Sequence, residues 1–192
     1  MRAAVVGLVW ALGVASEPDA SDVAGLRSEV LGEVGDWRFE ARCSAQTCIP
    51  VLVVPGAGGS VLVLPTVPDD PPWEVDGVAL HKLTLVDLDS DAKPELKVEW
   101  RAISKPRAAV GSWHRDLTTI VDTRAVAVRM HVETGSFGGA SEMHCAGTLT
   151  FQSDAATLNQ GCQLRACMVG GALPGECETG PKQQTHRVTW MR

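Results

Sequence analysis

Four acidic side chains lie close together in one short polar stretch of the 192-residue chain. Asp87, Asp89, Asp91 and Glu95 stand at positions 1, 3, 5 and 9 of this stretch, and Lys93 stands at position 7. Carboxylate oxygens and backbone carbonyls, such as that of Lys93, are the ligands that Ca²⁺ prefers. Carboxylates held this close repel one another unless a cation is present. The spacing therefore predicts a calcium site with all five residues as ligands.

The stretch 87–96 resembles the calcium loop of FG-GAP and VCBS-type β-propeller repeats, whose pattern is D-x-D-x-D-G-x-x-D-L. The three aspartates, Glu95 and Leu96 match this pattern position by position, with glutamate in place of the last aspartate. Ala92 stands where the pattern has glycine, and alanine in the left-handed backbone favoured there costs about 1 kcal/mol. The resemblance implies a local calcium hairpin and no propeller, because a propeller needs several blades and the pattern occurs once. The alternative is a solvated acidic hairpin without an ion.

Strand-like segments must position this loop. Apolar and polar residues alternate with a period of two at residues 37–43, 96–102, 125–132 and 145–151, and glycine- or proline-rich turns separate the segments. Such alternation is typical of antiparallel strands with one buried face. The pattern predicts an all-β fold, an antiparallel sandwich or barrel of roughly ten strands.

The alternation between residues 125 and 133 also predicts which side chains face the core. The apolar set, expected to share one face, is Val126, Val128, Met130 and Val132. Arg129, His131 and Glu133 are expected on the opposite, solvent-facing side. If the fold brought His131, Glu133 and His144 together they could bind zinc; the alternative is a polar outer face.

The N-terminal residues 1–16 have the pattern of a secretory signal peptide. One positive charge at Arg2 precedes an uncharged run, residues 3–14, and small residues follow it. The run is too short to span a bilayer, which takes about 20 residues; a buried N-terminal strand or helix is the alternative. Residues 17–35 are polar and contain apolar residues at helical spacing, which predicts a possible short helix. Residues 36–192 are expected to form a single β domain.

The six cysteines predict disulfide bonds, because an even count in an exported chain is typical of a disulfide framework. Six cysteines allow 15 pairings, so spacing alone does not fix the connectivity. A zinc site is the alternative, but no C-x₂-C pair is present. We expect neighbours to pair, giving a disulfide-stapled domain with the bonds Cys43–Cys48, Cys145–Cys162 and Cys167–Cys177.

Residues that could support catalysis or ligand binding are sparse. Ser112, His114 and Asp116 alternate along one expected strand, where neighbours on a face are about 6.6 Å apart, so they cannot form a catalytic triad. Trp73 and Trp113 fall outside the clear apolar faces and are candidates for an exposed glycan-binding platform.

The net charge of −6 disfavours nucleic acid or an anionic membrane as a partner, because both need a basic surface. The sequence predicts a secreted or periplasmic, calcium-stabilised β-domain that binds a protein or glycan, or is structural, and that catalyses nothing. The alternative is a secreted hydrolase whose catalytic residues are dispersed along the chain. Neither the partner nor the oligomeric state follows from the sequence.

Overall fold

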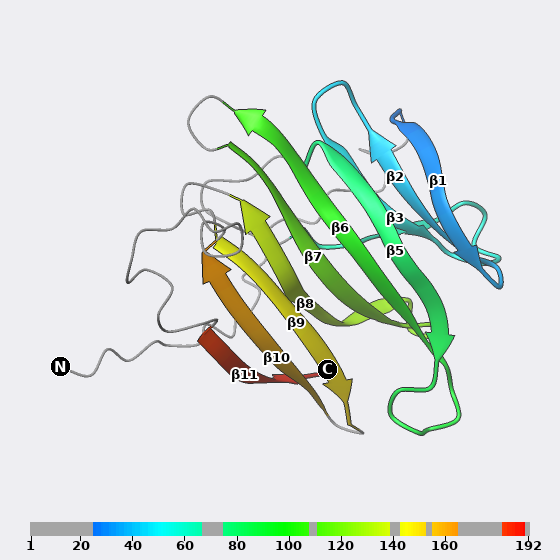
Figure 1. Ribbon diagram of the computed structural model, residues 1–192. Helices are drawn as coiled ribbons and strands as arrows, with labels where there is room; N and C mark the ends of the chain where they lie inside the picture. Colours follow the sequence, from blue (N-terminus) through cyan, green and yellow to red (C-terminus); the bar gives the residue numbers. More distant parts are fainter. Residues whose placement is uncertain are drawn as a thin grey trace, which may run out of the picture.

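The computed structural model describes residues 25–66, 75–107, 111–138, 143–152, 155–164 and 182–190. These residues form eleven strands in two antiparallel sheets, so the all-β prediction is confirmed (Figure 1). The expected signal peptide and the pairing Cys167–Cys177 lie outside the described residues. No helix in the described ranges is long and apolar enough to cross a membrane.

The smaller sheet has four strands in the order β1-β2-β3-β4. Each strand pairs with its neighbour in sequence, so the sheet is a simple meander of hairpins. The strands are β1 (Arg27–Val34), β2 (Trp37–Cys43), β3 (Cys48–Val53) and β4 (Val61–Val63).

The larger sheet has seven strands in the order β11-β10-β9-β8-β7-β6-β5, again a meander. The acidic stretch that begins at Asp87 forms the turn between the edge strand, β5, and its neighbour, β6. The strands are β5 (Gly77–Val86), β6 (Glu95–Arg107), β7 (Gly111–Asp122), β8 (Ala127–Gly138), β9 (Met143–Phe151), β10 (Ala155–Leu164) and β11 (Lys182–Thr189).

The possible N-terminal helix is not supported, because residues 27–34 form β1 instead. A two-residue turn at Gly35 and Asp36 joins β1 to β2, and Gly35 has a φ of 55°, which glycine adopts without strain. Backbone pairing with the buried strand β2 thus outweighs a weak helical pattern. A bulge between Val30 and Gly32 adds one residue to β1 and blurs the period of two that would have identified it.

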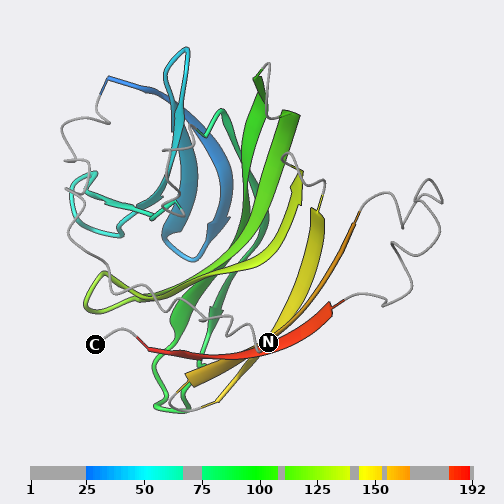
Figure 2. The same ribbon diagram turned by 90° about the vertical axis from the view of Figure 1, so that its left-hand side faces the viewer.

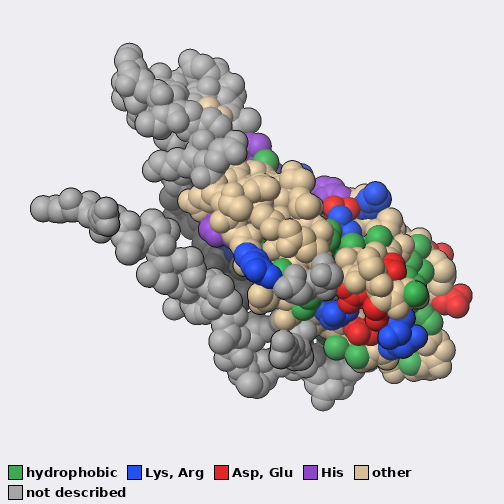
Figure 3. Space-filling model, turned by 90° about the horizontal axis from the view of Figure 1, so that it is seen from below, with side chains coloured by type: hydrophobic (Ala, Val, Ile, Leu, Met, Phe, Trp, Pro, Cys, Tyr) green, Lys and Arg blue, Asp and Glu red, His purple; other side chains and the backbone are tan. Residues whose placement is uncertain are grey.

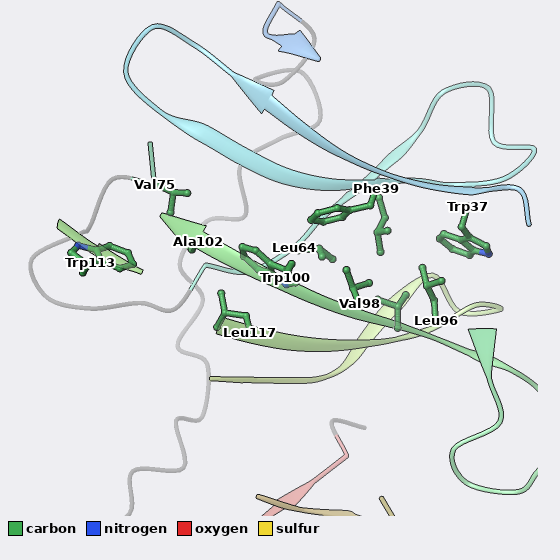
Figure 4. Close-up of a cluster of buried hydrophobic side chains, with 12 residues drawn as sticks. Trp37, Phe39, Leu64, Val75, Leu96, Val98, Trp100, Ala102, Trp113 and Leu117 are labelled. Atoms are coloured by element: carbon green, nitrogen blue, oxygen red, sulfur yellow. The ribbon is translucent and has the colours of Figure 1, made fainter. Parts of the chain in front are cut away.

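The main hydrophobic core lies between the smaller sheet and one face of β5–β7 (Figure 4). Alternate residues of β6 supply its centre, and Trp100 is fully buried against Phe39, with ring centroids 6.3 Å apart. The buried members are Trp37, Phe39, Leu52, Leu64, Val75, Leu96, Val98, Trp100, Ala102, Trp113, Leu117 and Val121.

A second, smaller core lies on the opposite face of the larger sheet. Ile120, Met130 and Ala156 are buried there, and Phe151 and Trp190 pack against them. Figure 2 shows β10 and β11 (orange to red) separated from β5–β7 (green) at one end and approaching them at the other. The central strands are therefore covered on both faces, which explains why β7 carries a run of buried residues from 117 to 121.

The predicted core face of residues 125–133 is wrong at a β-bulge. Val121 pairs with Val128, whereas the adjacent Ile120 pairs with Met130, so Arg129 is an extra residue in β8. The bulge places Val128 in the main core and Met130 in the second core. It also turns His131, expected in solvent, towards Trp100, at 6.2 Å between ring centroids.

Gly147 lies on β9 next to the point where the pairing of β9 with β8 ends, at Ala146. A Cβ at this position would lie 2.9 Å from the backbone oxygen of Thr134 and 2.9 Å from Leu158 Cδ1. We expect Gly147→Ala to lower the free energy of unfolding by about 1–2 kcal/mol, because the backbone must shift to admit the methyl group. Urea unfolding measures the loss. Gly77→Ala on β5 is the control, since its nearest contact would be an ordinary 3.7 Å to Ile103; equal losses would contradict the crowding argument.

Both disulfides that fall within the described residues have the predicted connectivity. Cys43 bonds to Cys48 across the β2–β3 hairpin, and Cys145 bonds to Cys162 across β9 and β10. In each case the two cysteines are directly paired in the strand register. No free cysteine occurs in the described part of the chain, which is typical of proteins from oxidising compartments.

Candidate metal centre

The turn between β5 and β6 brings three carboxylates together. One oxygen from each of Asp87, Asp89 and Glu95 lies within 4.8 Å of the other two. Glu95 begins strand β6 and is only 4% exposed, whereas Asp87 is exposed and Asp89 is half-buried. This acidic cluster, in part enclosed by protein, is a group that could hold a metal ion.

The backbone of the loop folds around the Asp87 carboxylate. The N–H of Asp91 donates to Asp87 Oδ1 (3.1 Å) and the N–H of Ala92 donates to Asp87 Oδ2 (3.0 Å). Ser90 and Ala92 both have a φ of 63°, so the left-handed backbone expected at Ala92 is confirmed. This conformation is strained for residues with a Cβ. The loop therefore uses strained residues to bring three of its carboxylates, those of Asp87, Asp89 and Glu95, close together.

Arg129 from the β8 bulge is the counter-charge of this cluster. Its Nη1 donates to Asp89 Oδ2 (3.0 Å) and to Glu95 Oε1 (2.9 Å). Partial burial acts to lower the pKa of Arg129, but its hydrogen bond to Asp89 and the charges of Asp89 and Glu95 raise that pKa above its usual value. The guanidinium also lies over the ring of Trp190, 4.9 Å from the centroid. Arg129 thus links the acidic loop to the residue after β11.

The other two predicted ligands lie at the rim of the loop. Asp91 is not a member of the three-carboxylate group. Its carboxylate accepts from the Lys93 backbone N–H (2.9 Å) and pairs with Lys93 Nζ (3.1 Å). Desolvation acts to raise the pKa of Asp91, but the bonds to Lys93 outweigh it and lower that pKa. The roles of Asp91 and of the Lys93 carbonyl as ligands remain predictions.

The donor set fits a hard cation. Arg129 occupies Asp89 Oδ2 and Glu95 Oε1, which leaves Asp89 Oδ1, Glu95 Oε2 and the Asp87 carboxylate with oxygen lone pairs. Glu95 Oε2 accepts the backbone N–H of Leu88 (2.9 Å), so its position is fixed.

In Figure 3 acidic and basic side chains are intermingled on the face seen from below, and no patch of a single sign dominates the described surface there.

The zinc alternative has no support from the geometry. His131 points into the main core, Glu133 pairs with Arg115 (3.5 Å), and His144 lies edge-on to Phe137. Within the described ranges, the acidic cluster is the single group of His, Cys, Asp or Glu side chains close enough to hold an ion.

Two members of the β7 trio, His114 and Asp116, have other partners, and the side chain of Ser112 lies outside the described part of the structure. Asp116 accepts from Arg101 at 2.7 and 3.0 Å and bonds to His81 Nε2 at 3.0 Å, while His114 stacks on Phe137. Desolvation acts to raise the pKa of Asp116, but Arg101 and His81 outweigh it and lower that pKa. Asp116 is therefore an ion-pair partner joining β5, β6 and β7.

The expectation of an exposed Trp113 is wrong, since this side chain is only 9% exposed. Trp113 lies on the same face of β7 as Leu117, so it belongs to the main core, and the Arg115 guanidinium covers its ring at 5.2 Å. Trp73, the other platform candidate, lies outside the described residues.

Sequence reasoning missed two residues that act at these clusters, Arg129 and His81. Both reach their carboxylates from other strands, 34 and 35 positions away in sequence, so local spacing holds no signal for them.

Comparison with known proteins finds no match: no family model, no curated protein and no solved structure matches this chain.

Proposed function

We propose that this chain is a non-catalytic β-domain of binding or structural type, which works outside the cytoplasm and uses its acidic loop as a calcium site that stabilises the fold. The observation that carries the proposal is the convergence of three carboxylates, from Asp87, Asp89 and Glu95, to within 4.8 Å. Like charges at this distance repel, and Arg129 offsets only part of the charge. A divalent cation that accepts oxygen ligands would remove the remaining repulsion.

The proposed location and partners rest on separate observations. Two disulfides, each joining paired strands, support an oxidising compartment, either the exterior or the periplasm. The net charge of −6 argues against nucleic acid as the partner, which leaves a protein or a glycan. The ion pairs of Asp116 and the burial of Trp113 give no support to the alternative of a dispersed hydrolase site.

A thermal melt of the disulfide-bonded protein in EDTA, Ca²⁺ or Mg²⁺ tests the calcium site. At a free Ca²⁺ concentration 100 times the dissociation constant, the expected gain in the free energy of unfolding is about 2.7 kcal/mol. Mg²⁺ should stabilise less, because it demands a tighter octahedral geometry. Ala92→Gly should bind Ca²⁺ more tightly, since it relieves the backbone at a φ of 63°.

The matched variants separate metal binding from general charge effects. Asp87→Asn keeps one oxygen that can accept a backbone N–H of the loop, but it loses the second acceptor oxygen and one charge, so the Ca²⁺ response should fall sharply. Glu29→Gln on the exposed part of β1 makes the same charge change away from the loop and should leave the response intact. If millimolar Ca²⁺ leaves the melting temperature unchanged in both the parent and Ala92→Gly, the loop does not bind Ca²⁺ and the proposal is wrong.

A further inference from the structure

We propose that His131 makes this fold acid-sensitive: protonation of its ring at mildly acidic pH weakens the packing of the two sheets. Its Nδ1 lies 3.0 Å from Thr119 Oγ1, and its ring lies against Trp100, the fully buried centre of the main core. Although the residue as a whole is half-buried, its Nε2 atom is enclosed and has no hydrogen-bond partner among the described residues. The proposal does not depend on calcium.

The hydrogen bonds around His131 suit a neutral ring and oppose a charged one. Trp100 Nε1 can only donate, and it donates to Thr119 Oγ1 at 3.0 Å. The hydroxyl is then free to give its own proton to His131 Nδ1, which leaves the ring proton on Nε2. A second ring proton on Nδ1 would force the Thr119 hydroxyl to turn its own proton away, while the charged Nε2–H stayed unpaired.

Within the described ranges, His131 bonds to Thr119 and has no acidic partner. Among the described residues on the strands beside His131, the charged side chains on its face are Arg115 of β7 and Glu133 of β8, and these pair with each other at 3.5 Å. The charged residues of β6 nearest to Trp100 are Lys97, Glu99 and Arg101; they alternate with the core residues and lie on the opposite face. Trp100 offers little cation–π attraction, because its ring is tilted by 37° at 6.2 Å. Burial accordingly lowers the pKa of His131 from 6.5 to about 4.

The sign of the pH effect follows from this shift. The folded pKa lies below the unfolded value, so the stability that His131 contributes as a neutral group is complete above pH 6.5 and is lost as the pH falls towards 4. Between pH 7 and pH 4.5 the unfolding equilibrium constant should rise roughly 60-fold through this one group. The lowered pKa values of His114, Glu40 and Asp116 also favour unfolding in acid, so a variant must isolate the part due to His131.

Urea unfolding of the full, disulfide-bonded chain between pH 7 and pH 4.5, in EDTA, provides the test. Glutamine in His131→Gln cannot titrate in this range, so the 60-fold rise in the unfolding equilibrium constant should disappear. The number of protons taken up on unfolding, read from the pH dependence, should fall by up to one. His186→Gln is the control, because His186 bonds to Gln184 on the edge strand β11, away from the main core; its pH dependence should match that of the parent. Equal pH dependence in His131→Gln and the parent would overturn the proposal.

A second measurement keeps the proposal testable if His131→Gln does not fold. NMR titration of the parent follows each imidazole ring directly while the protein remains folded. A His131 ring that stays neutral below pH 5 supports the proposal. A ring that takes up its proton near pH 6.5 without unfolding overturns it.

Discussion

Trp100→Ala is expected to lower the free energy of unfolding by about 3–5 kcal/mol, the largest loss of any single change considered. Trp100 is 0% exposed and packs between Phe39 of the smaller sheet and its own strand neighbours. Alanine would leave a large cavity at the contact between the sheets, and Thr119 would lose the indole N–H that donates to it. Since a domain is stable by about 5–15 kcal/mol, much of the total would be lost.

Urea unfolding of three variants measures this effect and assigns its cause. Ile103→Ala removes an apolar side chain from the same strand, but Ile103 is 37% exposed on the opposite face, so the loss should stay below about 1 kcal/mol. Trp100→Phe keeps most of the packing and removes the N–H donor, so its loss should be intermediate. Similar losses in Trp100→Ala and Ile103→Ala would show that the face of β6 that contains Trp100 is not the one that packs into the main core.

Glu95→Ala is expected to cost about 3 kcal/mol in the absence of any metal, because it breaks a largely buried ion pair on one side. The Glu95 side chain is 5% exposed and joins Arg129 to the backbone N–H of Leu88. Its removal leaves Leu88 N–H without its acceptor and leaves the Arg129 guanidinium, 24% exposed, with Asp89 alone. The remaining bond to Asp89 keeps the loss at the lower end of the range for buried pairs.

The matched control is Asp91→Ala, which removes a carboxylate from the same loop. Asp91 pairs with Lys93 at the surface, where solvent screens the pair, so its removal should cost far less stability than the removal of Glu95. Both variants should be unfolded with urea in EDTA, so that the measured loss reports protein contacts alone. A loss for Glu95→Ala no greater than that for Asp91→Ala would mean that Arg129 does not depend on Glu95.

The fold class could be predicted because the strands of this chain alternate clearly wherever one face is buried. Residues 96–102 show this best: Leu96, Val98, Trp100 and Ala102 all lie in the main core. The pairing of nearby cysteines was also predictable, since hairpins bring such residues together. The existence of β1, where a short helix was expected, and the faces of β8 were not, because a single extra residue at a bulge reverses every face beyond it.

In the candidate metal site, too, some residues could be predicted from the sequence and others could not. The positions of Asp87, Asp89 and Glu95 could be predicted, since their convergence depends on a ten-residue loop and its left-handed backbone at Ala92. The contribution of Arg129 could not, because it depends on the register between β7 and β8 and on the bulge that gives Arg129 its direction. Residue spacing along the chain describes local geometry, whereas this contact joins residues 34 positions apart.

The two cross-strand disulfides have a consequence for the response of this domain to mechanical load. A force along the chain can strip the hydrogen bonds of β2 from β3 only as far as Cys43–Cys48, which lies beside the turn. It reaches few of the hydrogen bonds between β9 and β10, because Cys145–Cys162 lies near the open end of that hairpin. Cys43–Cys48 and Cys145–Cys162 then carry the tension as covalent bonds, so the segments between them, with separations of 5 and 17 residues, cannot be extended. Because each bond joins residues that are already opposite one another, a stretched chain that relaxes brings these strands back in the correct alignment. A slip of one residue, which would turn the apolar side chains of β9 and β10 to the wrong face, is thereby prevented at both hairpins.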